Sequence, residues 1–277
     1  MAITAQEVNK LRQMTGAGMM DCKKALVEAE GDFDKAIEIL RKKGQKLSEK
    51  RADRETKEGS VFVRTSEDNA SAVLVAFTCE TDFVAKNDDF QTLGGEIADA
   101  AMANTPADLE ALKALSLGEQ TVQEKVTELL GKIGEKLEVT AFESLSGDQV
   151  ASYIHSNGKL GVLVALSGVN GADVADAGKD VGMQIAAMSP VALDKDGVDA
   201  AVIEKEIEIG KDQARQEGKP EAILDKIAQG KLQKFFKENT LLSQSFVKEP
   251  KQSVAQYLDS VQKGLTVSAF KRVSIGG

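Results

Sequence analysis

An internal repeat constrains the fold of this chain more than any other feature of its sequence. Strand-like apolar segments occur in two pairs, each separated by a short polar turn: 61–65 with 71–78, and 150–156 with 159–166. A third strand-like segment also occurs twice, because residues 137–142 (LEVTAF) resemble residues 265–270 (LTVSAF). Helical patterns lie between the hairpin and the third segment in both copies. We therefore expect an α+β protein with two copies of one unit, each a three-stranded antiparallel sheet covered on one face by helices.

The turns of the two expected hairpins are polar. Residues 66–69 (SEDN) would connect the first pair, and Asn157-Gly158, a strong two-residue turn signal, would connect the second. His155 is the single histidine of the chain and would lie in a strand next to this second turn. It has no second histidine with which to share a metal, so we expect a structural or contact role.

The two copies differ where the first hairpin ends. Residues 79–86 (CETDFVAK) follow an apolar strand and precede a helical pattern, whereas the second copy has SGVNG at 167–171 and no aromatic residue. One interpretation is that Thr81 caps a helix and Phe83 packs on the sheet. The other is that Asp82 and Phe83 project into a partner. The lack of an aromatic residue in the second copy makes projection as well supported as packing, because an aromatic needed only for packing should occur twice.

The second copy contains an insertion at 197–236 with two narrow apolar stripes. Ile203, Ile207, Gly210 and Ala214 form the first stripe, and the second follows a tight reversal at 218–220. Because the outer faces are strongly polar, we expect an antiparallel helical coiled-coil hairpin that projects from the body. Ordinary packing of these helices on the core is the alternative.

Residues 1–45 have the pattern of a three-helix unit. Thr4 and Glu7 form a capping box, and glycines near residues 16–18 and 31 separate the helices. A unit this small is marginal as an independent fold, so a docking role is expected. Residues 46–59 read as a charged linker, partly helical; a basic RNA-binding arm over 41–57 is the alternative, which the interleaved acidic residues disfavour.

Composition limits the classes of partner. The chain has 277 residues, 42% of them hydrophobic, and a formal net charge of −9, which argues against broad binding to nucleic acid or anionic membranes. Residues 1–10 are polar and the longest apolar runs are short, so we expect no signal peptide and no membrane span. Cys22 and Cys79 are then expected to be reduced thiols of a cytoplasmic protein.

The usual catalytic motifs do not occur in the sequence. There is no phosphate-binding loop, no dinucleotide fingerprint and no nucleophile elbow, and the carboxylates are spread over expected helix surfaces. We therefore expect no catalytic residue, no cofactor and no resident metal, and we expect that the protein is not an enzyme.

Two longer motifs carry a family resemblance. Residues 15–26 (TGAGMMDCKKAL) and 81–86 (TDFVAK) closely resemble the two signatures of the bacterial elongation factor Ts family, and the resemblance extends over nearly the whole chain. It implies the following organisation: a ubiquitin-associated-like three-helix module at 1–45, the linker at 46–59, a core N-subdomain at 60–145, and a core C-subdomain at 146–277 that contains the 197–236 hairpin.

The resemblance also implies a function. A protein of this family is a guanine-nucleotide exchange factor that binds elongation factor Tu in its GDP-bound and then nucleotide-free state, with no direct nucleic-acid or membrane partner. The resemblance assigns displacement of the partner's Mg²⁺ to Thr81, Asp82, Phe83 and Val84. It assigns docking by the N-terminal module to Met19, Met20, Asp21 and Lys23, and docking by the C-subdomain to His155, Asn157 and Gly158. Two classes stay open as alternatives: a scaffold that binds a ubiquitin-like protein, and an RNA-associated factor.

Overall fold

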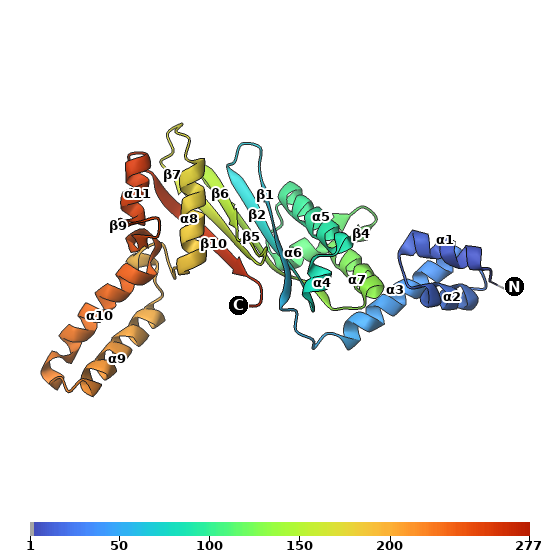
Figure 1. The fold of residues 1–277 in the computed structure, drawn as a ribbon, viewed down its shortest axis with the longest axis horizontal. Coiled ribbons are helices and arrows are strands. Elements are labelled where there is room, and N and C mark those ends of the chain that lie inside the picture. Colours follow the sequence, from blue (N-terminus) through green and yellow to red (C-terminus); the bar gives the residue numbers. More distant parts are fainter. Residues whose placement is uncertain (1–2) are drawn as a thin grey trace.

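The computed structural model describes residues 3–277, and its parts follow one another along an elongated molecule (Figure 1). Three N-terminal helices lie at one end, two sheets with their covering helices lie in the middle, and a pair of long helices extends at the other end. Within the described residues, no helix combines the length and the apolar character that are needed to cross a bilayer.

The N-terminal helices are α1 (Ala5–Thr15), α2 (Met19–Glu28) and α3 (Phe33–Lys50). The predicted capping box is confirmed, because the Thr4 side chain accepts from the Glu7 N–H and the Glu7 carboxylate accepts from the Thr4 N–H. Buried Leu11 and Leu26 are part of their small common core. Helix α3 continues to Lys50, so the first residues of the expected linker are helical.

The first sheet is antiparallel with strand order β1-β2-β5. Its strands are β1 (Glu58–Thr65), β2 (Ser71–Cys79) and β5 (Leu137–Ser146). Its outer face is covered by α5 (Asp88–Asn104), α6 (Leu109–Ala114) and α7 (Val122–Ile133), with the small ribbon β3 (Ser116–Leu117) and β4 (Gln120–Thr121) nearby. Phe77 of β2 and Phe90 of α5 stack with ring centroids 4.3 Å apart in this core.

The second sheet is antiparallel with strand order β10-β7-β6. Its strands are β6 (Gln149–Ile154), β7 (Leu160–Ser167) and β10 (Thr266–Ser274). Its core includes residues of α8 (Ala175–Met188) and α11 (Val254–Val261). Short elements fill the connections: η1 (Lys195–Gly197), η3 (Leu241–Ser243), β8 (Ser245–Phe246) and β9 (Glu249–Ser253).

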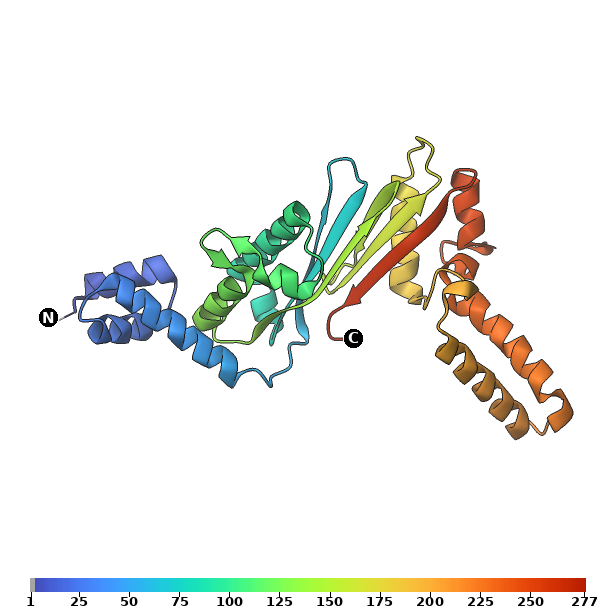
Figure 2. The same ribbon diagram turned by 180° about the vertical axis from the view of Figure 1, so that it is seen from behind.

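The inner faces of the two sheets pack against each other. Val61, Leu74 and Ala76 of the first sheet form one buried cluster with Leu163 and Ala165 of the second. The central strands β2 and β7 are therefore buried on both faces, which explains their nearly continuous apolar sequences. Helices cover the outer faces, and the sheets form the middle layers (Figure 2).

The two sheets share the same local irregularities. The register between β2 and β5 shifts after Val139, which lies opposite Phe77, and the register between β7 and β10 shifts after the corresponding Val267, which lies opposite Leu166. The two hairpin turns also share the same backbone hydrogen bond. The Asn69 N–H donates to the Ser66 carbonyl at 2.9 Å, as the Gly158 N–H donates to the His155 carbonyl at 2.8 Å.

This turn corrects one detail of the second hairpin. The expected strands at 150–156 and 159–166 would leave only Asn157-Gly158 between them, but β6 ends at Ile154 and β7 begins at Leu160. His155 therefore lies in the connecting loop and not in a strand. The reason is that only Gly158 of the pair takes a positive φ, 72°, whereas a two-residue turn of the asparagine-glycine kind needs positive φ at both positions.

The long helices at the other end are α9 (Ala200–Gln216) and α10 (Leu224–Asn239), joined through η2 (Glu221–Ile223). They pack closely on one another, because a Cβ added to Gly210 would lie only 3.1 Å from the Ala228 Cα. Both ribbon views show this pair extending away from the sheets. Packing flat on the core, the alternative considered from the sequence, is therefore wrong.

Candidate functional site

The segment after β2 turns into a very short helix, α4 (Asp82–Ala85). Thr81 precedes this helix in an extended conformation, and its hydroxyl oxygen accepts from the Val84 N–H at 3.4 Å. The predicted helix cap at Thr81 is therefore confirmed. Ala85 is buried, so it anchors the end of the single helical turn.

Phe83 points away from the protein. Its side chain is 82% exposed, the highest value among the large hydrophobic residues described as exposed. The neighbouring Val84 is half-buried and packs against the core of the first sheet. The interpretation that Phe83 packs on the sheet is therefore wrong. The structure therefore places a large aromatic ring in water, next to a valine that packs on the core.

Asp82 lies on the same turn and is exposed. Its carboxylate accepts from the Lys86 ammonium at 2.9 Å, one helical turn away. The hydrogen bond from Lys86, and then the Lys86 charge, lower the pKa of Asp82 below its ordinary value. Asp82 therefore presents a carboxylate, partnered by a surface lysine, beside the exposed ring.

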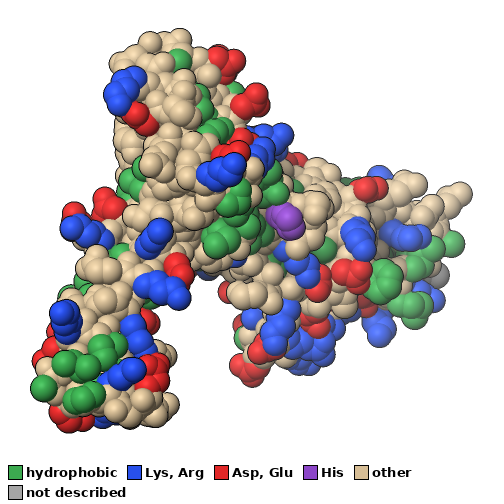
Figure 3. All heavy atoms as spheres, turned by 60° about the vertical axis from the view of Figure 1, so that its left-hand side comes forward, with side chains coloured by type: hydrophobic (Ala, Val, Ile, Leu, Met, Phe, Trp, Pro, Cys, Tyr) green, Lys and Arg blue, Asp and Glu red, His purple; other side chains and the backbone are tan. Residues whose placement is uncertain are grey.

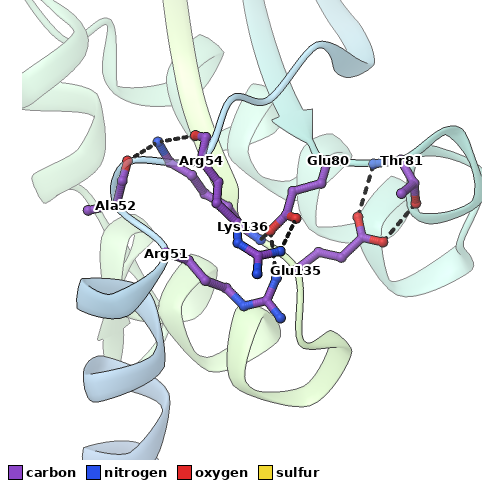
Figure 4. Close-up of polar contacts among 7 residues, drawn as sticks. All are labelled: Arg51, Ala52, Arg54, Glu80, Thr81, Glu135 and Lys136. Atoms are coloured by element: carbon purple, nitrogen blue, oxygen red, sulfur yellow. Dashed lines mark hydrogen bonds and ion pairs between the residues drawn. The ribbon is translucent and has the colours of Figure 1, made fainter.

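Two glutamates hold the backbone just before this turn (Figure 4). Glu135 accepts from the Thr81 N–H at 3.0 Å and from the Thr81 hydroxyl at 2.8 Å. Glu80 accepts from Arg51 and Arg54, each at 2.7 Å, and from the Lys136 N–H at 2.6 Å. These contacts join three segments that are far apart in the sequence.

Among these acids, the Glu80 carboxylate has the pKa that is shifted most. Burial by itself would raise its pKa, but the hydrogen bonds from Lys136, Arg54 and Arg51 outweigh burial and lower the pKa to about 2. Its side chain is only 16% exposed, so these bonds are poorly screened by water. Glu80 is therefore ionised throughout the physiological range.

Sequence reasoning missed Glu80, Glu135 and their basic partners. Glu80 stands in the quoted motif, but Arg51 and Arg54 were assigned to a solvated linker. The pairing of Glu135 with Thr81 spans 54 residues and follows no local spacing rule. The one available signal was the position of Glu135 between the end of a helix and the start of the third strand, where side chains gather at one end of the sheet.

The loop that carries His155 lies at the same end of the sheets as α4. The Val61 N–H donates to the Gly158 carbonyl at 2.8 Å, and Lys159 pairs with Glu58 at 2.5 Å. Glu58 in turn lies opposite Cys79, just before α4. The structure thus brings Asn157 and Gly158 near the Thr81–Val84 segment.

His155 itself is exposed, and its Nδ1 atom lies 3.0 Å from the Tyr153 hydroxyl. The space-filling view shows the histidine on the surface beside hydrophobic side chains (Figure 3). Neighbouring Ile154 is also exposed, at 43%. Among the described residues the imidazole has a tyrosine neighbour and no paired acid, and its exposed position is compatible with surface contact.

The candidate residues of the N-terminal helices form a separate surface. Met19 and Met20 are 48% and 62% exposed at the start of α2, and Lys23 is exposed one turn later. Asp21 is half-buried and pairs with Lys43 of α3, so its charge is partly neutralised within the N-terminal helices. Helix α2 and helix α4 lie in different parts of the molecule, so these residues are not brought next to Phe83.

The remaining candidate groups are the acidic side chains and the two cysteines. Within residues 3–277, no cluster of histidine, cysteine, aspartate and glutamate side chains has a metal-binding arrangement. Cys22 and Cys79 are both buried thiols. Burial, with the nearby charges of Glu135 and Glu58, raises the pKa of Cys79 to about 12, so its thiolate is disfavoured.

The family model described as elongation factor TS matches residues 80–277. A protein named elongation factor Ts from Amoebophilus asiaticus is 57% identical over 276 residues, covering 100% of both chains. Another from Cytophaga hutchinsonii is 59% identical over 274 residues and covers 99% of both chains, and one from Chloroherpeton thalassium is 41% identical over 284 residues. The chain therefore belongs to the elongation factor Ts family of translation elongation factors.

Proposed function

We propose that this protein is a guanine-nucleotide exchange factor, and not an enzyme, that acts on elongation factor Tu in the cytoplasm. It binds the GDP-bound GTPase, displaces Mg²⁺ from it and promotes GDP release, so that GTP can bind the nucleotide-free complex. The observation that carries this proposal is the Phe83 ring, 82% exposed on a helical turn that is fixed at both ends. Family membership supports it further.

The chemistry of the partner site explains why one ring can suffice. A GTPase holds its nucleotide largely through the phosphates and a Mg²⁺ ion, which requires near-ideal octahedral coordination. A small displacement of the groups that coordinate Mg²⁺ therefore weakens the whole site. Phe83 inserts as an apolar wedge, Val84 extends the apolar contact, and the Asp82 carboxylate competes for polar partners. Thr81 fixes the start of the turn.

Two docking surfaces hold the partner while Phe83 acts. The exposed Met19 and Met20, with Lys23 and Asp21, contact the nucleotide-binding domain from the N-terminal module. His155, Asn157 and Gly158 contact another domain of the GTPase. Attachment at two surfaces raises the local concentration of the wedge at its target without any further bond to the wedge itself.

The finer organisation of the fold belongs to the same proposal. We assign a ubiquitin-associated-like module to 1–45, a linker to 46–59, and two duplicated subdomains to 60–145 and 146–277. The matching turns and register shifts of the two sheets support duplication. Close packing of α9 on α10 supports a coiled coil within the insertion expected at 197–236.

Linkage sets the scale of the effect. If the factor weakens nucleotide binding, the nucleotide weakens factor binding by the same ratio. Each ~1.4 kcal/mol of coupling changes either affinity tenfold, so several kcal/mol correspond to many hundredfold. If most of this change lies in the dissociation rate, GDP release accelerates on a similar scale.

The test is release of a fluorescent GDP from purified elongation factor Tu, followed by stopped flow with and without this protein. Acceleration that saturates with factor concentration, and that is reduced by added free Mg²⁺, is the expected result. An unchanged release rate at micromolar factor would reject the proposal.

The RNA-associated alternative loses support from the ion pairs. Five of the basic residues in the 41–57 segment are paired with acidic side chains within the protein: Lys42, Lys43, Arg51, Arg54 and Lys57. Pairing leaves less free positive charge for phosphate binding. We therefore do not propose RNA binding as a second function.

A further inference from the structure

The turn that carries Phe83 has little stability of its own. Helix α4 contains four residues, and a helix this short is unstable in isolation because nucleation is unfavourable. Phe83 is exposed and contributes no packing that would hold it in place. The direction of the ring must therefore be set by the residues on either side of the turn.

Glu135 holds the start of the turn at two points. One carboxylate oxygen accepts from the Thr81 N–H at 3.0 Å and the other accepts from the Thr81 hydroxyl at 2.8 Å. Because the hydroxyl gives its single hydrogen to Glu135, an oxygen lone pair is left to accept from the Val84 N–H. Glu135 thus fixes both the Thr81 backbone and the helix cap.

Glu80, the residue that precedes Thr81, is bound to two other segments of the chain. Its Oε1 atom accepts from Arg51 and from the Lys136 N–H, and its Oε2 atom accepts from Arg54. The Lys136 ammonium donates to the Ala52 and Arg54 carbonyls at 2.7 and 3.0 Å. Figure 4 shows these side chains converging at the point where α3, β2 and the α7–β5 connection meet.

We propose that Glu80 and Glu135 are positioning residues that fix the direction of Phe83, and that Arg51 and Arg54 couple this direction to helix α3. The proposal deepens the proposed function and rests on it, because Phe83 is taken as the group that acts on the partner. Neither glutamate touches the partner's nucleotide; both act through Thr81 and α4.

The coupling has a continuous physical route. Helix α3 ends at Lys50, directly before Arg51, and packs on α7 where Gly44 meets Gly131. Helix α7 ends at Ile133, directly before the connection that supplies Glu135 and Lys136. The two helices that orient the N-terminal unit therefore also supply the side chains that hold Thr81. A change in the orientation of that unit would therefore move Arg51 and Arg54 on one side, and Glu135 and Lys136 on the other.

The first test compares exchange kinetics of Glu135→Ala, Glu135→Gln and the control Glu143→Ala. Glu143 is a similarly half-exposed glutamate that pairs with Lys271 between β5 and β10, away from α4. We expect Glu135→Ala to lower the maximal rate of GDP release about tenfold or more, with a small change in the half-saturating concentration, because a misplaced group is costly while docking is intact. Glutamine keeps one acceptor, so it should recover part of the rate.

The second test is a double-mutant cycle with Phe83→Ala. If Glu135 acts through the ring, Glu135→Ala should have little further effect once the ring is removed. If the fold-decrease in GDP release of the double variant equals the product of the fold-decreases of the two single variants, the positioning role is wrong. A wild-type maximal rate in Glu135→Ala would also overturn it.

A third measurement needs no partner. Amide hydrogen exchange should become faster at residues 81–85 in Glu135→Ala and at residues 51–54 in Glu80→Gln, while 71–77 stay protected in both. If wild-type protein does not accelerate GDP release, the proposed function fails and this measurement alone decides the structural role. Unchanged exchange at residues 81–85 in Glu135→Ala, or at 51–54 in Glu80→Gln, would overturn the proposed contact even if nucleotide exchange by the wild type is fast.

Discussion

Gly131 of α7 meets Gly44 of α3 so closely that a Cβ added to Gly131 would lie 3.2 Å from the Gly44 Cα. The neighbour at this distance is backbone, which cannot move aside as a flexible side chain can. We expect Gly131→Leu to separate the two helices and to lower the free energy of unfolding by about 1–3 kcal/mol, as overpacking does. Urea denaturation measures the loss.

The same substitution at Gly230 is the matched control. Gly230 lies within α10, and a Cβ added there would have no heavy atom within 4 Å. Gly230→Leu should therefore raise helix stability by up to about 1 kcal/mol, since leucine has the higher helix propensity. Equal effects of the two substitutions would show that the helix crossing does not matter.

Phe83→Ala should separate activity from stability. Because the ring is 82% exposed, we expect the free energy of unfolding to stay within about 0.5 kcal/mol of wild type. If the ring is a contact hot spot worth about 2 kcal/mol or more, GDP release from elongation factor Tu should slow about thirtyfold. Stopped-flow release and thermal denaturation on one preparation give both values.

Phe77→Ala is the natural contrast, because this phenylalanine is only six residues earlier but fully buried against Phe90. Its truncation should cost about 3–5 kcal/mol of stability. A Phe83→Ala protein that loses as much stability as Phe77→Ala would mean that the ring is part of the core, contrary to the exposure observed.

Glu80 should make stability depend on pH in acid solution. Its pKa is about 2 in the folded protein and 4.5 in its ordinary state, so above pH 4.5 it is ionised in both states and contributes fully. Between pH 4.5 and 2 only the unfolded chain takes up the proton, so the contribution falls as pH falls and is lost near pH 2. The shift corresponds to at most about 3–4 kcal/mol, since each pKa unit is worth about 1.4 kcal/mol.

The measurement for Glu80 is the difference in unfolding free energy between wild type and Glu80→Gln across pH 7 to 3. This difference should be constant down to about pH 4.5 and shrink below it. Glu110→Gln is the control, because Glu110 is 81% exposed in its pair with Lys113 and a surface pair contributes little. A difference that grows in acid would contradict the assignment.

Lys23→Glu should test docking by the N-terminal helices. Lys23 is exposed, so its charge reversal should leave stability nearly unchanged. If Lys23 faces the GTPase, association should slow, and the dependence of its rate on salt should differ from that of wild type. Lys179→Glu is the control, because Lys179 is also exposed but lies on α8, so this charge reversal should leave the association rate unchanged. Asp21 is less suitable, because its pairing with Lys43 would also be lost.

Much of the fold follows from local sequence rules. The capping box at Thr4 and the start of α4 at Thr81 need only nearby hydrogen bonds, and both appear as predicted. The loop around His155 differs because turn type depends on the φ of Asn157, which the asparagine-glycine pair favours but does not dictate. Contacts between the two sheets were not predicted, because the strand pattern does not show which surface covers the second face of each sheet.

The candidate site divides in the same way. The asymmetry between the repeats made an exposed Phe83 as well supported as a packed one, the family resemblance favoured exposure, and the ring is exposed. The carboxylates that support it could not be identified from sequence, because Glu80 and Glu135 meet their partners across 29 and 54 residues. Charged residues in a polar segment look solvated until the fold brings an opposite charge beside them.

Strands β2 and β7 are hidden on both sides because each sheet acts as the lid of the other. Separating the two halves between β5 and β6 would remove this cover from both and leave Leu74 and Leu163 facing water. Each half expressed by itself should therefore aggregate or pair with a second copy, because its inner sheet face would be a large exposed apolar patch.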